Sequence, residues 1–477
     1  MNLNEEELFF AAARTNLKVF LEAAFATIYP GSQFMDNWHI DAIVYRLERA
    51  IEGREPRLII NLPPRQLKSF IVSVVLPAFI LGMDPAAKIV CVSYSDDLAR
   101  ALSREFGRIV DSPWYRRYFS HVRFIKTAEA EFVTDAGGGR YATSVGGTLT
   151  GRGGDFVLVD DPIKPADAHS DKTRESTNEW FRSTLLSRLN DKKRSVLIVV
   201  MQRLHVNDLA GFIQADGYTT LSLPAIARQD EKIFLSDTEY YFRPEGEPLH
   251  AEREDEETLE LIRRQLGSYN FAAQYQQNPD TPEGGMFKRK WFKVVSTPPR
   301  FTRRGTWLIT IDSALSTAET ADYSVITVIY ADDEGYWVIH SERGHWEYET
   351  LKEKALGYRR RITGELFYVV EAAGVGESLI IALRKAGLYT FHYWPKTSKL
   401  GRAALAVPII EFGRVHLYNK EGRSAWVEPY LNEFATFPHG RNDDQVDALT
   451  QLLPWAERRF NPGANYIRPD EYDEGSI

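Results

Sequence analysis

The sequence contains a single cysteine, Cys91, among its 477 residues. One cysteine excludes an intrachain disulfide and a cysteine-rich zinc site, and it favours a reducing compartment. The longest apolar run, residues 70–81, has about 12 residues and includes Pro77, whereas a membrane span needs about 20. The N-terminal segment is acidic where a secretion signal would be basic. We therefore expect a soluble protein of the cytoplasm.

The sequence also lacks an excess of basic residues. It has 58 Lys and Arg against 66 Asp and Glu, which gives a formal net charge of −8. This balance excludes a protein that holds nucleic acid by bulk charge, as histones do. It is compatible with a nucleic-acid enzyme whose basic residues gather on one surface. The length predicts two large folding units or about three ordinary ones.

Short runs rich in Val and Ile follow a first segment, residues 5–53, that has the apolar period of helices. Helical stretches separate several of these runs, and Pro, Gly or charged residues bound them. This pattern predicts the buried parallel strands of an α/β domain. The predicted strands are residues 57–62, 88–94, 155–160 and 195–201.

A loop with the sequence PPRQLKS follows the first predicted strand and precedes a helix. This arrangement predicts a nucleotide phosphate site, in which Lys68 reaches the β- and γ-phosphates and Ser69 binds Mg²⁺. The match to G-x-x-x-x-G-K-[ST] is incomplete, because Leu62 and Leu67 stand where glycines are expected. An ordinary helix N-terminus is the alternative interpretation of the loop alone.

Two consecutive acids, Asp160 and Asp161, end the strand DFVLVD. In a nucleotide hydrolase the first can hold the magnesium shell and the second can orient the attacking water. A solvated pair of acids at a strand end is the alternative. The Lys-Ser loop and the acidic strand end together favour an NTPase.

The second half of the sequence predicts a different sheet. Three strands with short connections, residues 306–312, 323–332 and 335–344, form an antiparallel meander, and a fourth follows at 366–372. Acidic residues stand at two strand ends and at the start of the last helix: Asp312, Glu371, Asp443, Asp444 and Asp447. Acids from a strand, a second strand and a helix favour an RNase H-like site, which gathers carboxylates around two divalent ions about 3.5–4 Å apart.

These segments resemble the large terminase subunits of tailed bacteriophages from about residue 34 to 455. In the first half the resemblance lies in PPRQLKS, GRGGDFVLVDDP, WFRSTLLSRL and VVMQRLHVNDLAG. In the second half it lies in ITIDSALS, VVEAAGVGES and NDDQVDAL, and FAAQYQQNP with GGMFKRKWF resembles the family's connector. The resemblance implies an α/β protein with an N-terminal RecA-like, P-loop ATPase domain of the ASCE type. It also implies a C-terminal RNase H/RuvC-like nuclease domain.

The resemblance also implies roles for residues of the first domain. ATP with Mg²⁺ would bind at Pro64, Arg65, Gln66, Leu67, Lys68, Ser69 and Asp160, with adenine near Trp38 and His39. Gln202 would belong to a coupling segment, residues 201–203. Asp161, where many such motors carry Glu, would be the catalytic carboxylate. Independently of the resemblance, Arg152 lies in a glycine-rich turn just before the Asp160 strand and is a candidate arginine finger acting on a neighbouring subunit. Arg65 and Arg188 are competing candidates, and an ordinary surface arginine is the alternative interpretation of Arg152.

In the second domain, two Mg²⁺ or Mn²⁺ ions would be held by Asp312, Glu371 and the acids of the last helix. Asp312, Glu371 and Asp444 are the expected catalytic set, with Asp443 and Asp447 as further candidate ligands. The implied partners are double-stranded DNA, a procapsid with its portal protein, a small terminase subunit and further copies in a ring, expected to be a pentamer. The implied location is the host cytoplasm and, transiently, the portal vertex, but not the mature virion, and no membrane is involved.

The predicted division of the chain follows these motifs. It comprises an ATPase domain with a helical lead-in at 1–250, a connector at 251–304, a nuclease domain at 305–460 and a disordered tail at 461–477. The connector's basic stretch, residues 288–304, is either a surface that tracks DNA or a solvated linker. Two other functions stay open: a helicase–nuclease of DNA repair, and a DNA-binding scaffold that ATP switches.

Overall fold

The computed structural model describes residues 5–149, 151–279, 285–301, 305–313, 323–372, 374–395 and 397–460. The chain divides into two compact units, Met1–Glu260 with Ala272–Asp280 and Leu261–Phe271 with Thr281–Ile477. The predicted connector therefore contributes residues to both units. The predicted tail lies outside the described residues, as do Arg303 and Arg304 of the basic stretch. No described helix is both long enough and apolar enough to cross a membrane.

The first unit is built on an eight-stranded sheet with the order β3-β4-β5-β2-β6-β7-β1-β8. The four strands predicted from the sequence are β1, β2, β6 and β7, and their pairings β2·β6, β6·β7 and β7·β1 are all parallel. β7 lies between the phosphate-loop strand and the strand of the two acids, so all three carboxyl ends meet at one edge. The strands of this sheet are β1 (Arg57–Asn61), β2 (Lys88–Ser93), β3 (Phe124–Ala128), β4 (Glu131–Thr134), β5 (Gly139–Ser144), β6 (Phe156–Asp160), β7 (Val196–Met201) and β8 (Thr219–Ser222).

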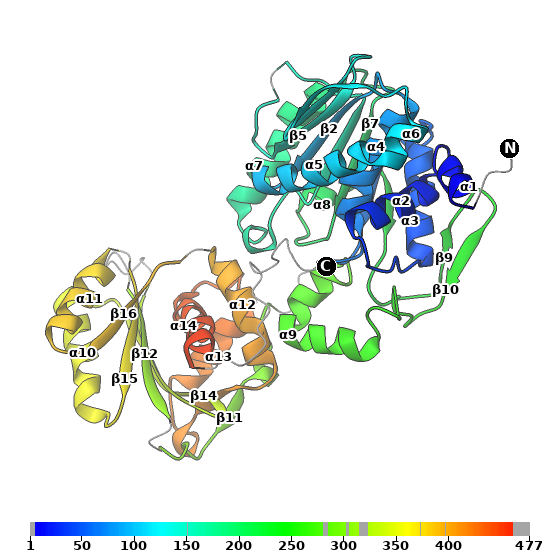
Figure 1. Cartoon of the computed structure of the whole chain (residues 1–477). Helices are drawn as coiled ribbons and strands as arrows, with labels where there is room; N and C mark the ends of the chain where they lie inside the picture. The colour runs from blue at the N-terminus through cyan, green and yellow to red at the C-terminus, as the bar shows by residue number, and fades with distance from the viewer. Residues whose placement is uncertain are drawn as a thin grey trace. The chain divides into compact units, whose positions relative to one another are not determined.

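Helices cover both faces of this sheet, because alternate strand residues point to opposite faces and here both sets are apolar. Leu58 and Ile60 of β1 pack in the core with α2–α5, while Ile59 packs with η3 and α8 on the opposite face. Figure 1 shows α4 and α5 passing over the strands. The helices are α1 (Glu5–Ala12), α2 (Leu17–Ile28), α3 (Trp38–Ile51), η1 (Phe70–Val75), α4 (Leu76–Met83), α5 (Asp96–Asp111), α6 (Pro113–Tyr118), η2 (Pro165–Asp167), α7 (Asp171–Trp180), η3 (Phe181–Leu185), η4 (Leu186–Arg188), α8 (Leu209–Ile213) and η5 (Gln214–Asp216).

The first unit also contains a hairpin, and a long helix that both units share follows it. β9 (Glu231–Phe234) and β10 (Tyr240–Arg243) pair antiparallel with each other. α9 (Glu256–Gln274) follows, and Gly267 interrupts its helical backbone with a φ of 75°. The ends of α9 belong to the first unit and its middle, Leu261–Phe271, belongs to the second.

The second unit has a seven-stranded sheet with the order β11-β17-β14-β13-β12-β15-β16. As predicted, β12, β13 and β14 form an antiparallel meander, and β15 pairs parallel with β12. Figure 1 shows α10 and α11 on one face and α12, α13 and α14 on the other. The elements are η6 (Arg289–Trp291), β11 (Lys293–Val295), β12 (Thr306–Asp312), β13 (Ser324–Asp332), β14 (Gly335–Gly344), α10 (Tyr348–Arg361), β15 (Leu366–Glu371), α11 (Val375–Lys385), β16 (Tyr389–Tyr393), α12 (Lys399–Glu411), β17 (Val415–Tyr418), η7 (Lys420–Gly422), α13 (Val427–Thr436) and α14 (Asp444–Phe460).

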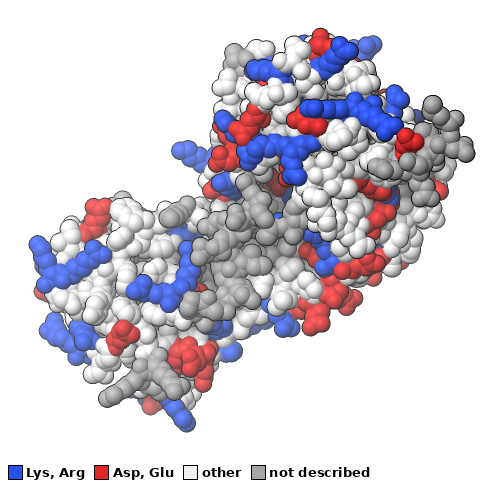
Figure 2. Space-filling model, viewed as in Figure 1, with Lys and Arg blue, Asp and Glu red and all other residues white. Residues whose placement is uncertain are grey.

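Charged side chains of both signs share the surface of each unit. On the face shown in Figure 2, Lys and Arg lie among Asp and Glu rather than in one continuous basic stripe. In the predicted basic stretch, Arg289 pairs with Glu428 at 2.7 Å and also donates to Asn432. That arginine is thus partly neutralised within its own unit.

Candidate active sites

The predicted phosphate loop leaves the carboxyl end of β1 in a strained conformation. Arg65 has a φ of 63° and Leu67 a φ of 59°, the left-handed region in which a side chain costs about 1–2 kcal/mol. Leu67 thus adopts the backbone that a glycine would take before the lysine. Pro64 and Gln66 are buried and Arg65 is exposed. At the start of the loop, Asn61 donates from Nδ2 to the Met201 carbonyl at 3.1 Å, which holds it to the end of β7.

The two predicted acids meet the Lys-Ser pair of the loop. Lys68 Nζ lies 2.5 Å from Asp161 Oδ2. Ser69 Oγ donates to Asp160 Oδ1 at 2.9 Å, and Ser73 Oγ donates to Asp160 Oδ2 at 3.1 Å. The sequence analysis did not identify Ser73 as a site residue. Its hydroxyl contacts Asp160 from the π-helical turn η1 that follows the loop, and no sequence motif indicated this turn.

The electrostatics of this cluster fit a bound magnesium ion. Burial, followed by the neighbouring Asp161, raises the pKa of Asp160, and Lys68 with the two serine hydroxyls only partly offsets this. A buried carboxylate short of positive charge beside a serine hydroxyl is a hard-oxygen donor set of the kind that Mg²⁺ prefers. Ser69 and Asp160 are therefore the residues that would hold the ion of Mg-ATP.

The predicted coupling segment contacts the predicted catalytic carboxylate. The Gln202 amide donates to Asp161 Oδ1 at 3.2 Å, and the Asp161 amide donates to the Val200 carbonyl at 2.9 Å. Asp161 itself has a φ of 40°. The contacts join the end of β6 to the end of β7 and to the segment that follows it.

The residues expected near adenine are packed against the β9–β10 hairpin and its flank. The Trp38 ring stacks on Tyr241 with centroids 4.7 Å apart, and the Arg243 guanidinium lies 5.3 Å from the Trp38 ring. His39 is 1% exposed. Burial, with smaller contributions from His250, Arg253 and Arg243, lowers the pKa of His39 to about 3. His39 is thus a neutral core residue, and adenine contact by these residues stays a prediction.

The candidate arginine finger lies at the opposite end of β6 from Asp160. Arg152 precedes β6, pairs with Glu131 and lies over the Tyr141 ring, 4.0 Å from its centroid. A strand of five residues spans about 16 Å, so Arg152 does not reach its own phosphate loop. Of the alternatives, Arg65 lies in the loop itself, and Arg188 hydrogen-bonds Ser187.

The candidate nuclease residues come together where β12, β15 and α14 meet. β12 and β15 run parallel with Ile311 opposite Val370, so Asp312 and Glu371 end neighbouring strands. Thr310 of β12 is hydrogen-bonded to α14, donating to the Ala448 carbonyl at 2.9 Å and accepting from Gln451 at 2.8 Å. These bonds place the first turn of α14, with Asp444 and Asp447, beside Asp312.

Close packing at Glu371 requires one of the glycines in VVEAAGVGES. A Cβ at Gly376 would lie 2.0 Å from the Glu371 carbonyl oxygen. A side chain there would push the start of α11 away from the end of β15. The glycine at position 376 thus allows the start of α11 to pack against the backbone of Glu371, a predicted metal ligand.

Two cations of α12 occupy this site, and the sequence analysis missed both. Lys399 Nζ lies 2.9 Å from both Asp443 Oδ1 and Asp447 Oδ2, and Arg402 lies 2.8 Å from Asp447 Oδ1. Asp447 is 2% exposed, and burial raises its pKa although Arg402 and Lys399 partly offset this effect. No local pattern could reveal this contact, because 44 residues separate Lys399 from Asp443.

Two further carboxyl groups of this site, Asp312 and Glu371, have raised pKa values, although Lys399 lowers both of them and Arg402 lowers that of Glu371. Burial, followed by Glu371, Asp447 and Asp444, raises the pKa of Asp312 well above its usual range. Burial also raises the pKa of Glu371. Among the described residues, no three carboxylate or imidazole side chains already enclose a single position for an ion. The oxygen donors fit Mg²⁺ or Mn²⁺ chemically, and Lys399 and Arg402 supply positive charge beside them.

The raised pKa values of Asp312 and Glu371 predict that divalent metal stabilises the second unit. A carboxyl group whose pKa is raised on folding favours the folded state below its unfolded pKa, and this contribution is lost as the pH rises through the folded value. At pH 7.5, Mn²⁺ at 100 times its Kd should add about 2.7 kcal/mol. Thermal unfolding of the full chain with and without Mn²⁺ measures this, and Asp312→Asn should remove the metal-dependent gain. An equal gain in the variant would contradict the assignment.

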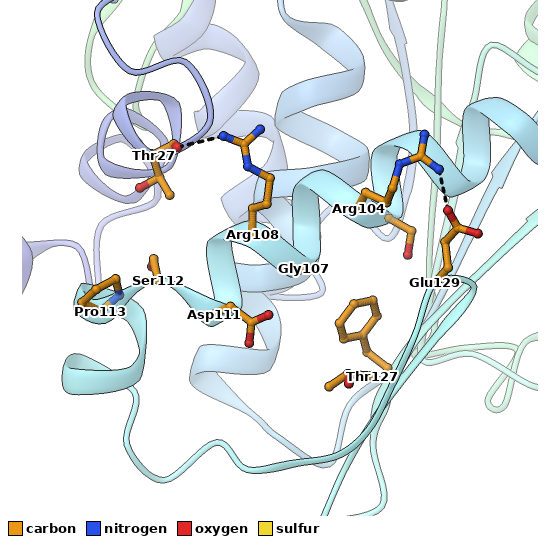
Figure 3. Close-up of a pocket in the computed structure, with 11 residues that line it drawn as sticks. Thr27, Arg104, Gly107, Arg108, Asp111, Ser112, Pro113, Thr127 and Glu129 are labelled. Carbon is orange, nitrogen blue, oxygen red and sulfur yellow. Dashed lines mark hydrogen bonds and ion pairs between the residues drawn. The ribbon is translucent and has the colours of Figure 1, made fainter.

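A groove of about 620 Å³ lies elsewhere in the first unit (Figure 3), lined by residues of α2, α5 and the β3–β4 hairpin. Two arginines of α5 bridge its rims: Arg108 donates to the Thr27 carbonyl, and Arg104 pairs with Glu129. None of the predicted site residues lines this groove.

Comparison with known proteins supplies the family context. The model of the terminase RNaseH-like domain family matches residues 309–454. The large terminase of the thermophilic bacteriophage D6E is similar in structure, with a TM-score of 0.52 and 10% identity over 88% of this chain and 98% of that chain. The HK97 bacteriophage large terminase matches at 12% identity over 92% of this chain and 98% of its own, with a TM-score of 0.35. The nuclease of the large terminase from thermophilic phage G20c, solved with bound magnesium, matches at 18% identity over 34% of this chain and 92% of its own, with a TM-score of 0.26. No curated protein matches the sequence.

The domain family and the D6E similarity cover different parts of the chain. The family match identifies the second unit as an RNaseH-like domain of terminase type, and the D6E structure shares the fold over most of the chain. The predicted fold class, a RecA-like domain followed by an RNase H-like domain, is confirmed.

Proposed function

We propose, from the confirmed resemblance to tailed-phage terminase large subunits, that this chain is the motor and nuclease subunit of a viral DNA-packaging machine. In this proposal, ATP hydrolysis in the first unit drives double-stranded DNA into a procapsid, and the second unit cuts concatemeric DNA. The observation that carries it is the meeting of Lys68, Ser69, Asp160 and Asp161 at one sheet edge, in a chain whose second unit gathers carboxylates.

The first unit's residues have distinct tasks in ATP hydrolysis. When the phosphates bind, Lys68 would exchange its Asp161 partner for β- and γ-phosphate oxygens, and Ser69 with Asp160 would hold Mg²⁺. Asp161, released from Lys68, would then orient the attacking water. The bond from the Gln202 amide to Asp161 would carry this change into the segment after β7.

In the second unit, the protein's own residues hold and orient the phosphodiester. Bound divalent ions would supply a nucleophilic water and stabilise the leaving oxygen. Asp312, Glu371 and Asp444 are the proposed ligands, and Asp443 is an alternate. Lys399 would leave Asp447 or Asp443 to neutralise the scissile phosphate, because its ion pairs, working against burial, raise its pKa and keep it charged.

The partners and the location belong to the same proposal. Double-stranded DNA is the substrate, a portal-bearing procapsid is the docking site, and a small terminase subunit delivers the genome. Copies of the chain would form a ring, a pentamer in our expectation, in the host cytoplasm and at the portal vertex, and would leave before the virion matures. D6E large terminase has been solved with ADP and G20c nuclease with magnesium, in line with the ligands proposed here.

One preparation tests both activities. ATP hydrolysis and Mn²⁺-dependent cleavage of plasmid DNA should both be measurable with the purified full chain. Strand separation of a duplex would instead favour a helicase–nuclease of DNA repair, and ATP binding without metal-dependent cleavage would favour a switched scaffold.

Arg152→Ala tests action between subunits. If Arg152 reaches the phosphates of a neighbouring copy, the ATPase rate per subunit should rise with protein concentration or on portal docking. The variant should lose that rise, since an arginine finger contributes roughly 10³–10⁵ in rate. Mixing Arg152→Ala with Lys68→Ala subunits should restore part of the activity. The Lys68→Ala subunit still supplies the arginine finger, and the Arg152→Ala subunit still supplies an intact phosphate loop. A rate that is independent of concentration and unchanged in the variant would rule Arg152 out.

A further inference from the structure

Backbone strain in the described part of the chain is concentrated around the nucleotide site. Five non-glycine residues there have a positive φ: Arg65, Leu67, Asp161, Gln277 and Glu421. Three of them belong to the phosphate loop and the acidic strand end, and Gln277 contacts the coupling segment. Such residues persist only where their surroundings hold them in place. The contacts that hold the strained segments are therefore of functional interest.

The first contact holds the phosphate loop. Gln66 lies between the two strained residues of the loop and is 2% exposed. Its Nε2 donates to Glu254 Oε2 at 2.9 Å. Glu254 belongs to a strap, residues 248–255, that leads directly into α9. The strap is also held beside Trp38 and His39, because Asn37 donates to the Leu249 carbonyl at 2.7 Å.

The second contact holds the coupling segment. Gln277, three residues beyond the end of α9, accepts a hydrogen bond at Oε1 from the Arg203 amide at 2.9 Å. Its Nε2 donates to the Gln274 carbonyl in the last turn of α9 at 2.5 Å. The side chain is buried and its backbone has a φ of 52°. Gln277 thus links the segment after β7 to the C-terminal end of α9.

The middle of α9 is anchored in the second unit. The Ser268 amide donates to Glu411 at 2.8 Å, and Asn270 donates to the Ala404 carbonyl at 3.2 Å, both partners lying in α12. At Gly267 a Cβ would lie 2.9 Å from Val407 of the same helix. α12 also carries Lys399 and Arg402, the cations that pair with Asp447.

We propose that Glu254 and Gln277 are positioning residues that couple nucleotide binding to the nuclease unit through α9. Phosphates entering the loop displace Gln66, and release of Asp161 from Lys68 shifts residues 201–203. Each movement is passed to one end of α9. Because the middle of α9 is bonded to α12, the change reaches the helix that holds the cations of the nuclease site. The inference rests on the proposed ATP site in the first unit.

Hydrogen exchange of the full chain tests this coupling. Binding of ATPγS should change the exchange of amides 261–271 in the wild type. Glu254→Ala should raise KM for ATP roughly tenfold, since it removes a hydrogen bond to a charged group, and should abolish the change at 261–271 at saturating ATPγS. Glu254→Gln keeps an oxygen acceptor for Gln66 and should behave as wild type. Gln277→Gly removes the Arg203 contact without backbone strain and should also uncouple α9.

Glu252→Ala, an exposed glutamate of the same strap, is the matched control and should leave both readouts unchanged. If Glu254→Ala does not fold, Glu254→Asp, which is one methylene shorter, replaces it. Unchanged exchange at 261–271 in nucleotide-bound wild type, or a wild-type response in Glu254→Ala, would overturn the inference. Failure of the wild type to bind ATPγS at all would instead overturn the ATP site itself.

Discussion

Lys68→Ala should abolish ATP turnover while metal-dependent DNA cleavage by the same full-length protein, assayed without nucleotide, continues. The ammonium group is buried beside Asp161 and is placed to neutralise charge on the β- and γ-phosphates. Loss of one preorganised electrostatic contact to a transition state typically lowers the rate by about 10²–10³. Release of phosphate from ATP at saturating Mg²⁺ measures the effect.

Lys88→Ala is the matched control for this experiment. Lys88 begins β2, so it lies at the opposite end of the sheet from the loop, and its side chain is exposed. This variant should hydrolyse ATP as the wild type does. A wild-type rate in Lys68→Ala would show that the loop assignment is wrong, whatever the control does.

Asp312→Asn should eliminate DNA cleavage while ATP hydrolysis and folding survive. The change keeps the shape of the side chain and removes the charge that a divalent ion requires. Asp312 comes from a central strand and interacts electrostatically with Glu371, Asp444 and Asp447, so it is the proposed shared ligand. Metal catalysis contributes several kcal/mol of transition-state stabilisation, which predicts a loss of roughly 10³-fold or more. Conversion of supercoiled plasmid to nicked and linear forms with Mn²⁺ is the measurement.

The control for the nuclease variant is Asp333→Asn. Asp333 is exposed in the turn between β13 and β14, at the end of β13 opposite to Val325, which pairs with Asp312. The variant should cleave DNA as the wild type does. A Mn²⁺ soak of crystals of the full chain would add a structural readout. Metal density away from Asp312, or undiminished cleavage by Asp312→Asn, would remove the two-metal interpretation and leave the ATPase unit unaffected.

The strands and the order of the two domains could be predicted from the sequence because their causes are local. The centre of RLIIN and the whole of VLIVVM are apolar at consecutive positions, which is typical of a strand buried on both faces. Asp160, Asp312 and Glu371 could be placed at strand ends for the same reason. Parallel strands end at the same edge of a sheet, so residues at these ends lie close together even when they are distant in the sequence.

The side-chain contacts around these sites could not be predicted because they join segments that are distant in the sequence. Lys399 and Arg402 meet Asp447 through the packing of α12 against α14, and Gln66 meets Glu254 across 188 residues. None leaves a periodic pattern. The left-handed backbone at Leu67 was not predicted either, although the motif expects a glycine there, because leucine rarely adopts the conformation that glycine normally supplies.

DNA uptake tests the central claim, an ATP-driven packaging motor with a separable nuclease, most directly. Purified chain, portal-bearing procapsids, linear duplex DNA and ATP are mixed, and the DNA that becomes resistant to added DNase is measured. We predict ATP-dependent protection of duplex DNA by the wild type and by Asp312→Asn, and none by Lys68→Ala. Strand separation with no protected DNA, or protection by Lys68→Ala equal to that by the wild type, would contradict the account.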